Sequence, residues 1–140
     1  MKNLHIAIIA TSFHKEHMEA MVEAARKTAK EEALRIVKEI WVPGCYEIPL
    51  TLKRLLASND IYGAVALGII ERGETKHGMV MGIVVHDAIV RLELESGKPV
   101  GLGILGPEIS LNQVPSRAKL YARKSVLALK AMLEKQHLAL

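Results

Sequence analysis

The sequence is poor in aromatic residues and in cysteine, and both shortages exclude classes of protein. Aromatic residues make up 4% of the 140 positions, so the core must be aliphatic, and the stacking side chains of RNA-binding domains are missing. The one cysteine, Cys45, excludes an internal disulfide and a cysteine-based zinc site. Because a lone cysteine suits a reducing compartment, we expect a cytoplasmic protein.

Long apolar runs and clusters of basic residues are also missing from the sequence. No apolar run approaches the ~18 residues needed to span a bilayer, and the N-terminus has no signal-peptide pattern. The 19 basic and 15 acidic residues leave a net charge of +4 that is spread along the chain, so we expect binding to neither membranes nor nucleic acid. A mildly basic chain fits anionic small molecules. The length predicts one domain, residues 1–140.

Short apolar runs alternate four times with longer amphipathic segments. The apolar runs predict strands at residues 4–10, 36–42, 63–70 and 100–105. Helical spacing predicts helices at residues 15–32, 48–57, 76–95 and roughly 113–136. Continuous apolar strands indicate burial on both faces, and right-handed crossovers then give a doubly wound arrangement. The predicted fold is α/β, a three-layer αβα sandwich with a four-stranded parallel, flavodoxin-like sheet.

Spacing also predicts details of the helices. Ser110 and Gln113 have the spacing of a capping box before the last helix. The inner side of that helix is predicted to carry Val114, Ala118, Tyr121, Ser125, Leu129 and Met132. Four methionines give the helices more apolar surface than a small sheet needs, namely Met18, Met21, Met79 and Met81. A role in the core explains these residues equally well.

Ligands of such sheets bind beyond the carboxyl ends of the strands, so the first two loops at that edge are candidate site segments. In the first loop, Phe13 is either a hydrophobic staple onto the next helix or a platform for a flat ring. His14 and His17 have the spacing of a metal pair but no evident third ligand. The second loop contains Cys45, which has no neighbouring His or Lys to activate it. It also contains Glu47, whose carboxylate either favours the helix N-terminus or recognises hydroxyl groups.

The third and fourth loops carry the positive charge. Gly73 and Thr75 at a helix start offer free backbone N–H groups, a geometry that binds phosphate. His77 falls in the first helical turn and is a candidate proton shuttle beside a phosphate leaving group. A solvated charged turn is the alternative interpretation. Beyond the compact fourth loop, three cations on the last helix are candidates for phosphate contact or plain surface charge, namely Arg117, Arg123 and Lys124.

Two of these segments carry a resemblance to a known family. Residues 42–49 (VPGCYEIP) resemble the VPG-[aromatic]-[acidic]-x-P element of the 6,7-dimethyl-8-ribityllumazine synthases. Residues 66–68 (ALG), followed by residues 72–77 (RGETKH), resemble that family's ALG…(R/K)G-x-T-x-H element. The similarity extends over nearly the whole chain, and residues 98–104 are similar to the fourth strand of the family. The short chain and the Gly-Pro at residues 106–107 are more similar to archaeal members.

The resemblance implies an enzyme, a transferase of riboflavin biosynthesis. Members of the family condense 5-amino-6-(D-ribitylamino)uracil with 3,4-dihydroxy-2-butanone 4-phosphate. The products are 6,7-dimethyl-8-ribityllumazine, phosphate and water, and neither a cofactor nor a metal takes part. The family assembles as homopentamers, some of which form icosahedral shells of sixty subunits, with sites between subunits. Riboflavin synthase is a further candidate partner.

The resemblance also implies roles for individual residues. His77 corresponds to the histidine that relays protons. Pyrimidine and ribityl contacts are implied for Phe13, Gly44, Cys45, Tyr46, Glu47, Ile69, Ile70 and Leu102. Phosphate contacts are implied for Gly73, Glu74, Thr75, Arg117 and, with a one-residue gap in the alignment, Lys124. The sequence departs from the family at His14, where bacterial members often have asparagine, and at Ser116, where many members have glutamate. It departs again near Leu102, where the family has an aromatic residue that reaches a neighbouring site.

Three other functions fit parts of the sequence. The first is an archaeal-type riboflavin synthase, which uses no phosphorylated substrate and leaves the loop around Gly73 unexplained. The second is a non-catalytic shell protein that binds flavin or lumazine and needs neither His77 nor Arg117. The third is a flavodoxin-like module that binds FMN in its loops.

Overall fold

The computed structural model describes residues 4–135, in which four strands and four α-helices alternate. The strands are β1 (Leu4–Thr11), β2 (Leu34–Val42), β3 (Gly63–Glu71) and β4 (Val100–Ile109). The helices are α1 (Lys15–Glu31), α2 (Ile48–Leu56), α3 (His77–Ser96) and α4 (Val114–Lys135). Two single 3-10 turns precede α2 and α4, at Cys45–Glu47 and Leu111–Gln113. The sequence predicted each strand and each helix, and residue 136, the predicted end of the last helix, lies outside the described residues.

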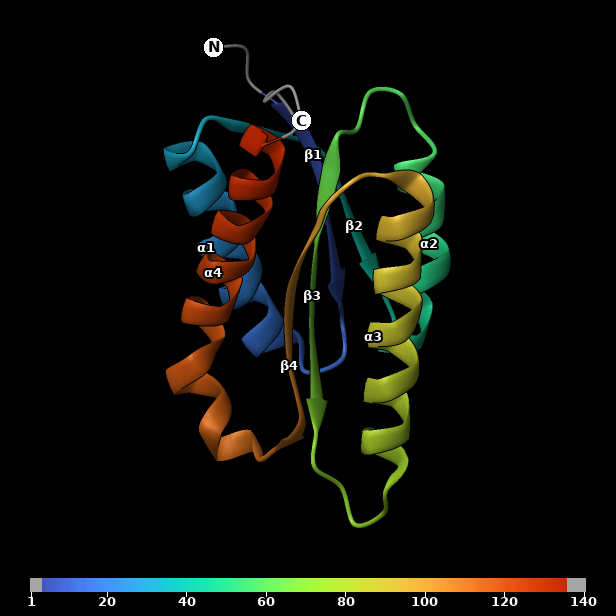
Figure 1. The fold of residues 1–140 in the computed structure, drawn as a ribbon. Helices are drawn as coiled ribbons and strands as arrows, with labels where there is room; N and C mark the ends of the chain where they lie inside the picture. The colour runs from blue at the N-terminus through green and yellow to red at the C-terminus, as the bar shows by residue number, and fades with distance from the viewer. Residues whose placement is uncertain (1–3, 136–140) are drawn as a thin grey trace.

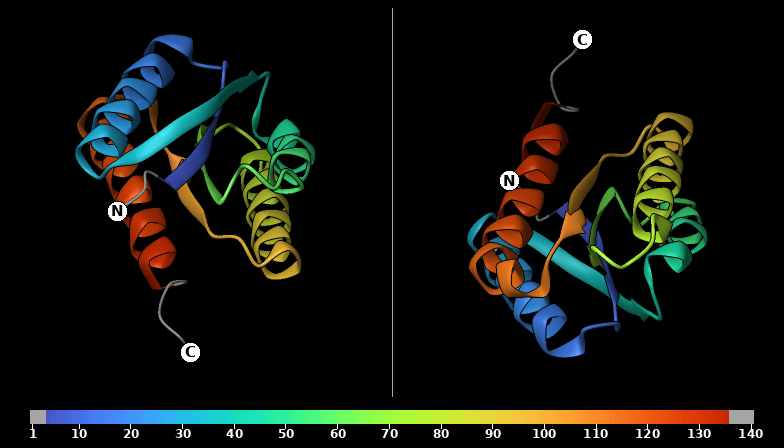
Figure 2. Two further views of the ribbon diagram at one scale, coloured as in Figure 1. Left: turned by 90° about the horizontal axis from the view of Figure 1, so that it is seen from above. Right: turned by 90° about the horizontal axis from the view of Figure 1, so that it is seen from below.

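The four strands form one parallel sheet in the order β2-β1-β3-β4. Helices α1 and α4 cover one face of the sheet, and α2 and α3 cover the other (Figure 1). The end-on views of Figure 2 show the sheet between these two helical layers. The predicted three-layer, flavodoxin-like αβα sandwich is therefore confirmed, and all four strands end at the same edge of the sheet.

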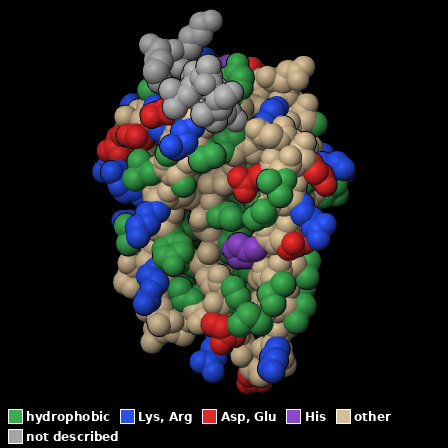
Figure 3. All heavy atoms as spheres, in the orientation of Figure 1, with side chains coloured by type: hydrophobic (Ala, Val, Ile, Leu, Met, Phe, Trp, Pro, Cys, Tyr) green, Lys and Arg blue, Asp and Glu red, His purple; other side chains and the backbone are tan. Residues whose placement is uncertain are grey.

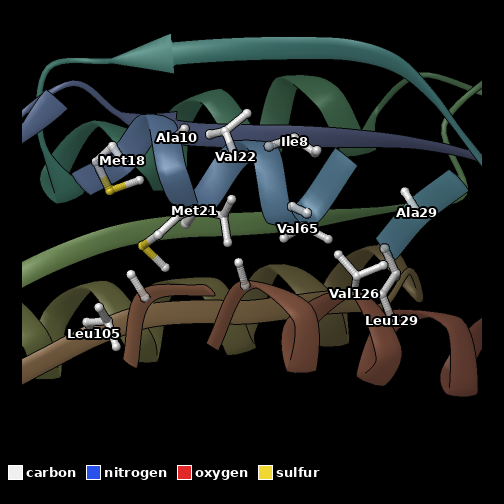
Figure 4. Close-up of a cluster of buried hydrophobic side chains, with 14 of the residues drawn as sticks. Ile8, Ala10, Met18, Met21, Val22, Ala29, Val65, Leu105, Val126 and Leu129 are labelled. Atoms are coloured by element: carbon white, nitrogen blue, oxygen red, sulfur yellow. The ribbon is translucent and has the colours of Figure 1, made fainter. Parts of the chain in front are cut away.

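Each face of the sheet buries its own hydrophobic cluster, because successive side chains of a strand point to opposite faces. On the α1 and α4 side, Ile8 of β1 belongs to one buried cluster with Met18 and Met21 of α1 and Leu129 of α4 (Figure 4). On the α2 and α3 side, the cluster includes Ile9 of the same strand. Burial on both faces explains the continuous apolar runs in the sequence. Met18 and Met21 are core residues and contribute no exposed surface.

The inner side of α4 differs from the predicted one. Tyr121 and Met132, expected to face the core, are exposed. The buried side chains of α4 are Val114, Ala118, Ala122, Ser125, Val126, Leu129 and Leu133. The cause lies in β4, where a Cβ added at Gly101 would come within 2.1 Å of the Ser125 carbonyl oxygen. Because α4 packs this closely against the sheet at Ser125, the Tyr121 ring has no room on its inner side and is exposed.

Two boundaries at the carboxyl edge also differ from expectation. Strand β4 continues to Ile109, which pairs with Glu71, so the predicted fourth loop is largely strand. The predicted capping box is present, and the Ser110 backbone N–H donates to the Gln113 side-chain oxygen at 2.9 Å. It closes the 3-10 turn from which α4 begins.

Helix α3 is apolar on its outer surface as well as toward the sheet. Gly82, Val85 and Ile89 face the core. Its exposed hydrophobic side chains are Met79, Val80, Ile83, Val84, Val90 and Leu94. In Figure 3, hydrophobic side chains gather on the face that carries β4 between α3 and α4. None of the helices within residues 4–135 is long and apolar enough to cross a bilayer.

Candidate active site

The loops after β1 and β2 are joined by two backbone hydrogen bonds. The Ser12 N–H donates to the Val42 carbonyl at 2.8 Å, and the Phe13 N–H donates to the Pro43 carbonyl at 3.3 Å. The Phe13 side chain is 61% exposed, which favours the ring platform over the hydrophobic staple considered from the sequence. Its only ring contact among the described residues is with the His14 imidazole, at a centroid distance of 4.3 Å. An exposed aromatic face thus lies at the carboxyl edge of the sheet.

The loop after β2 folds into the 3-10 turn Cys45–Glu47. Its tight shape brings the Glu47 carboxylate over Gly44, where an added Cβ would lie 3.4 Å from Glu47 Oε1. The Tyr46 ring and the Glu47 side chain are exposed, whereas Cys45 points into the protein. The turn therefore presents a carboxylate and a phenol to solvent on a backbone that Pro43 and Pro49 restrict.

Cys45 joins this turn to β3. A Cβ added at Gly68 would lie 2.8 Å from Cys45 Sγ, so the glycine makes room for the sulfur. Burial raises the pKa of the Cys45 thiol to about 12, with a smaller contribution from the charge of Glu47, while a hydrogen bond from the Ile69 backbone opposes the shift. The thiol is neutral at physiological pH and is not an activated nucleophile. Thr11, whose buried Oγ1 has no hydrogen-bond partner within residues 4–135, lies beside the same glycine.

The loop after β3 is the most open part of this edge. Ile69 and Ile70 are buried at the end of the strand, whereas Gly73, Glu74 and Thr75 are all exposed. A Cβ added at Gly73 would have no neighbour within 4 Å. Loop and helix are connected where the His77 backbone N–H donates to Thr75 Oγ1 at 3.3 Å. Free backbone N–H groups at the start of a twenty-residue helix favour an anion at this point.

The loops after β2 and β3 meet at two aromatic rings. The Tyr46 and His77 ring centroids are 6.1 Å apart, with the rings at 62° to each other. The turn of Cys45–Glu47 and the loop of Gly73 to Thr75, 26 or more positions apart in sequence, therefore lie side by side. This contact brings together the two segments that carry the family resemblance.

The remaining residues predicted for the site lie elsewhere in this chain. Arg117 borders a hollow of about 280 Å³ on the α4 side of the sheet, which neither Phe13 nor the loops around Tyr46 and His77 line. Its Nη1 donates to the Gln113 carbonyl at 3.3 Å. Lys124 is exposed two turns further along α4, and Leu102 is half-buried on the edge strand β4. One chain thus holds two separate groups of the predicted residues.

A family model agrees with these motifs. The model described as 6,7-dimethyl-8-ribityllumazine synthase matches residues 3–139. The chain belongs to the 6,7-dimethyl-8-ribityllumazine synthase family. A lumazine synthase of Methanopyrus kandleri is 35% identical over 128 residues, which cover 91% of this chain and 90% of the relative. One of Staphylothermus marinus is 36% identical over 130 residues, covering 93% and 87%, and one of Picrophilus torridus is 37% identical over 114 residues, covering 81% and 84%.

Family membership confirms the sequence-based assignment of function. The chain has lumazine synthase function, is a transferase, and acts in riboflavin biosynthesis. The archaeal character predicted from the sequence is confirmed as well, because these lumazine synthases are archaeal.

Sequence reasoning missed one member of the site region. Glu71, the last residue of β3, lies 3.2 Å from the His14 imidazole, measured from Oε1 to Nε2. The available signal was its position, because Glu71 is the first charged side chain after eight uncharged residues of a buried strand. His14 was noted as a departure from the lumazine synthase pattern, but its partner was not. Within residues 4–135 no group of three or more His, Cys, Asp and Glu side chains has a metal-binding arrangement.

Proposed function

We propose that this lumazine synthase condenses 5-amino-6-(D-ribitylamino)uracil with 3,4-dihydroxy-2-butanone 4-phosphate at the site around Tyr46 and His77. The observation that carries the proposal is the contact between these two rings, which joins a hydroxyl-recognition turn to a phosphate-type helix start. The substrate pair needs both features, because one substrate carries a ribityl chain and the other a phosphate.

The pyrimidine binds against the exposed ring of Phe13. An exposed aromatic face next to a rigid turn supports this role, because flat heteroaromatic rings stack on such faces. The ribityl hydroxyls bind along Gly44, Cys45 and Tyr46 and donate hydrogen bonds to the Glu47 carboxylate. Backbone groups of Ile69 and Ile70 meet the edge of the pyrimidine. The neutral Cys45 thiol supplies shape rather than reactivity.

The phosphate binds at Gly73, Glu74 and Thr75, where backbone N–H groups and the helix start favour an anion. The amine of the pyrimidine attacks the ketone to form an imine. Phosphate then leaves, an enol forms, and ring closure follows with loss of water. His77 relays protons during imine formation and phosphate loss. Since the amine is already nucleophilic, alignment of the two substrates supplies most of the acceleration.

The site is completed by a second copy of the chain. Arg117, Lys124 and Leu102 lie apart from the His77 loop in one chain, and an adjacent copy brings them to it. The exposed apolar surface of α3 supports this assembly, because contiguous exposed apolar surface marks interaction sites. In this proposal the chain forms homopentamers, either free or in a sixty-subunit icosahedral shell, and Leu102 provides an aliphatic wall to the neighbouring site.

Of the cations on α4, Arg117 has the better claim to the phosphate. It has no acidic partner among the residues that the structure describes, whereas Arg123 Nη1 lies 3.2 Å from Glu31 Oε1. Lys124 assists from the next turns of the helix. In this proposal residues 1–140 act as a single cytoplasmic lumazine synthase domain that uses neither a cofactor nor a metal, with riboflavin synthase as a partner.

A direct assay tests the proposed reaction. Purified protein is mixed with both substrates, and formation of the lumazine is followed by absorbance and fluorescence after subtraction of the uncatalysed rate. Saturable acceleration is the expected result. If the protein instead converts lumazine alone to riboflavin, the archaeal-type riboflavin synthase is the correct function. Binding of lumazine or flavin without turnover identifies a non-catalytic protein.

A further inference from the structure

His14 has a backbone conformation that few residues adopt. Its φ of 58° and ψ of 48° lie in the left-handed region, which is uncommon for residues other than glycine, although histidine is among those enriched there. Such conformations persist when surrounding contacts enforce them, and they cluster at functional sites. The conformation turns the chain at the start of α1 and directs the imidazole into the protein, where its side chain is 15% exposed.

The imidazole faces a single carboxylate. His14 Nε2 lies 3.2 Å from Glu71 Oε1, and the Glu71 side chain is 34% exposed. The nitrogen is buried and makes no directed hydrogen bond within residues 4–135. Nε2 and Oε1 are therefore in polar contact without the geometry of a hydrogen bond, in a partly buried place where solvent screens electrostatic attraction less than at the surface.

The pair links the two halves of the proposed site. On one side, the His14 ring packs against the Phe13 ring at 4.3 Å. On the other, Glu71 ends β3 and directly precedes the loop of Gly73 to Thr75. That loop is tied at its start by the Arg72 N–H, which donates to the Ile109 carbonyl at 2.7 Å. The His14–Glu71 contact thus spans from the aromatic face after β1 to the loop after β3.

We propose that His14 and Glu71 are positioning residues that fix the spacing between the pyrimidine on Phe13 and the phosphate at the β3 loop. The inference rests on the proposed condensation. Neither residue touches the reacting atoms; both act by holding the two loops at one separation. Because misplacement of a reactant by about 1 Å can cost on the order of 100-fold in rate, a loosened pair lowers kcat while each substrate still finds its own contacts.

The test is a double-mutant cycle. Glu71→Gln keeps the side-chain size and removes the charge, and His14→Gly removes the imidazole at a position whose φ glycine adopts freely. We expect each variant to lower kcat by about tenfold or more, with the dissociation constants for the pyrimidine substrate alone and for inorganic phosphate changed less than twofold. In the His14→Gly background, Glu71→Gln has no further effect on kcat, because coupled residues are non-additive.

Glu108→Gln is the matched control, because Glu108 Oε2 pairs at 3.4 Å with the exposed Arg72 at the same edge of the sheet. Its effect on kcat is the same with and without His14. Additive effects of Glu71→Gln and His14→Gly overturn the inference, as does a Glu71→Gln enzyme with unchanged kcat. If His14→Gly does not fold, the inference is tested by the kcat of the Glu71→Gln enzyme and by its dissociation constants for the pyrimidine substrate and inorganic phosphate. A wild-type protein that does not accelerate the condensation overturns the proposed function instead.

Discussion

The Tyr46 ring lies edge-on to the His77 imidazole, with the two centroids 6.1 Å apart. The two residues come from different crossovers, the 3-10 turn before α2 and the first position of α3. Parallel strands make this possible, because β2 and β3 end at the same edge of the sheet although β1 lies between them. The imidazole is exposed and has the phenol ring on one side.

Replacement of His77 tests how much of the catalysis is proton transfer. We expect His77→Ala to lower kcat by about 100-fold, within the range that general acid–base groups contribute. Activity above the uncatalysed rate remains, because both substrates are still held in line. The measurement is kcat under saturating substrates. Complete loss of activity with intact binding of both substrates contradicts the prediction that alignment of the substrates contributes more to the rate than proton transfer by His77.

Replacement of Arg117 tests which cation holds the phosphate. We expect Arg117→Ala to raise KM for the butanone phosphate about tenfold or more and to leave KM for the pyrimidine nearly unchanged, since charge-assisted bonds to phosphate are among the stronger polar contacts. Arg123→Ala is the matched control, because Arg123 is paired with Glu31 at 3.2 Å. Equal effects of Arg117→Ala on both KM values move the phosphate role to Arg123 or Lys124.

Much of the fold could be predicted because the relevant signals are local. The buried strands are continuous apolar runs, and the carboxyl-edge rule predicts from sequence that the loops of Phe13, Tyr46 and His77 lie at one edge of the sheet. The family resemblance then implies roles for single residues that the spacing of apolar and charged residues leaves open. Arg117 shows the difference, since spacing alone did not separate it from Arg123 and Lys124.

The errors and omissions share a physical cause, which is contact between distant segments. Tyr121 was placed inside because helical spacing ignores how closely α4 approaches Gly101 of β4. The His14–Glu71 pair joins positions 57 residues apart, and single-sequence patterns do not report such separations. The same limit applies to the proposed contacts between subunits, for which the sequence offers no pattern beyond the apolar side chains of α3.

That surface gives a prediction about assembly. Ile83 is 63% exposed on α3, and a charge there opposes burial against another subunit. We expect Ile83→Glu to yield smaller particles in sedimentation velocity and to lose activity more than tenfold, because in the proposed assembly a neighbour's Arg117 completes the site. Leu120→Glu, which places the same charge on an exposed apolar position of α4, is the control for charge alone, and we expect it to leave the particle size unchanged. An active monomer of Ile83→Glu contradicts the shared site.

The buried thiol predicts a loss of stability at alkaline pH. Burial raises the pKa of Cys45 from 9.0 to about 12, so the native state retains a proton that the unfolded state releases above pH 9. The free energy of unfolding therefore falls as the pH rises from about 9 to 12, by up to about 1.4 kcal/mol per pH unit from this group. Urea unfolding across that range measures the slope, and Cys45→Ala has the shallower one. Equal slopes contradict the assignment to the thiol.

The one tryptophan of the chain reports on an acid-sensitive cluster next to the loop of Phe13. Arg26 donates to both carboxylate oxygens of Glu39, at 2.7 and 2.6 Å, and the Trp41 indole N–H donates to Glu39 Oε2 at 3.2 Å. Hydrogen bonding by Arg26 lowers the pKa of Glu39 below its ordinary value of 4.5, against an opposing effect of burial. Stability from this carboxylate is therefore present above pH 4.5 and is lost as the pH falls through the lowered native pKa.

Protonation of Glu39 removes the charge next to the indole, so Trp41 emission changes with the same midpoint. We expect a midpoint below pH 4.5 in the native protein and a higher midpoint in Arg26→Gln, where burial acts without the guanidinium. Arg91→Gln is the matched control, because Arg91 pairs with Asp87 on α3 and contacts neither Glu39 nor Trp41. A midpoint that is the same in Arg26→Gln and in the native protein contradicts Arg26 as the cause.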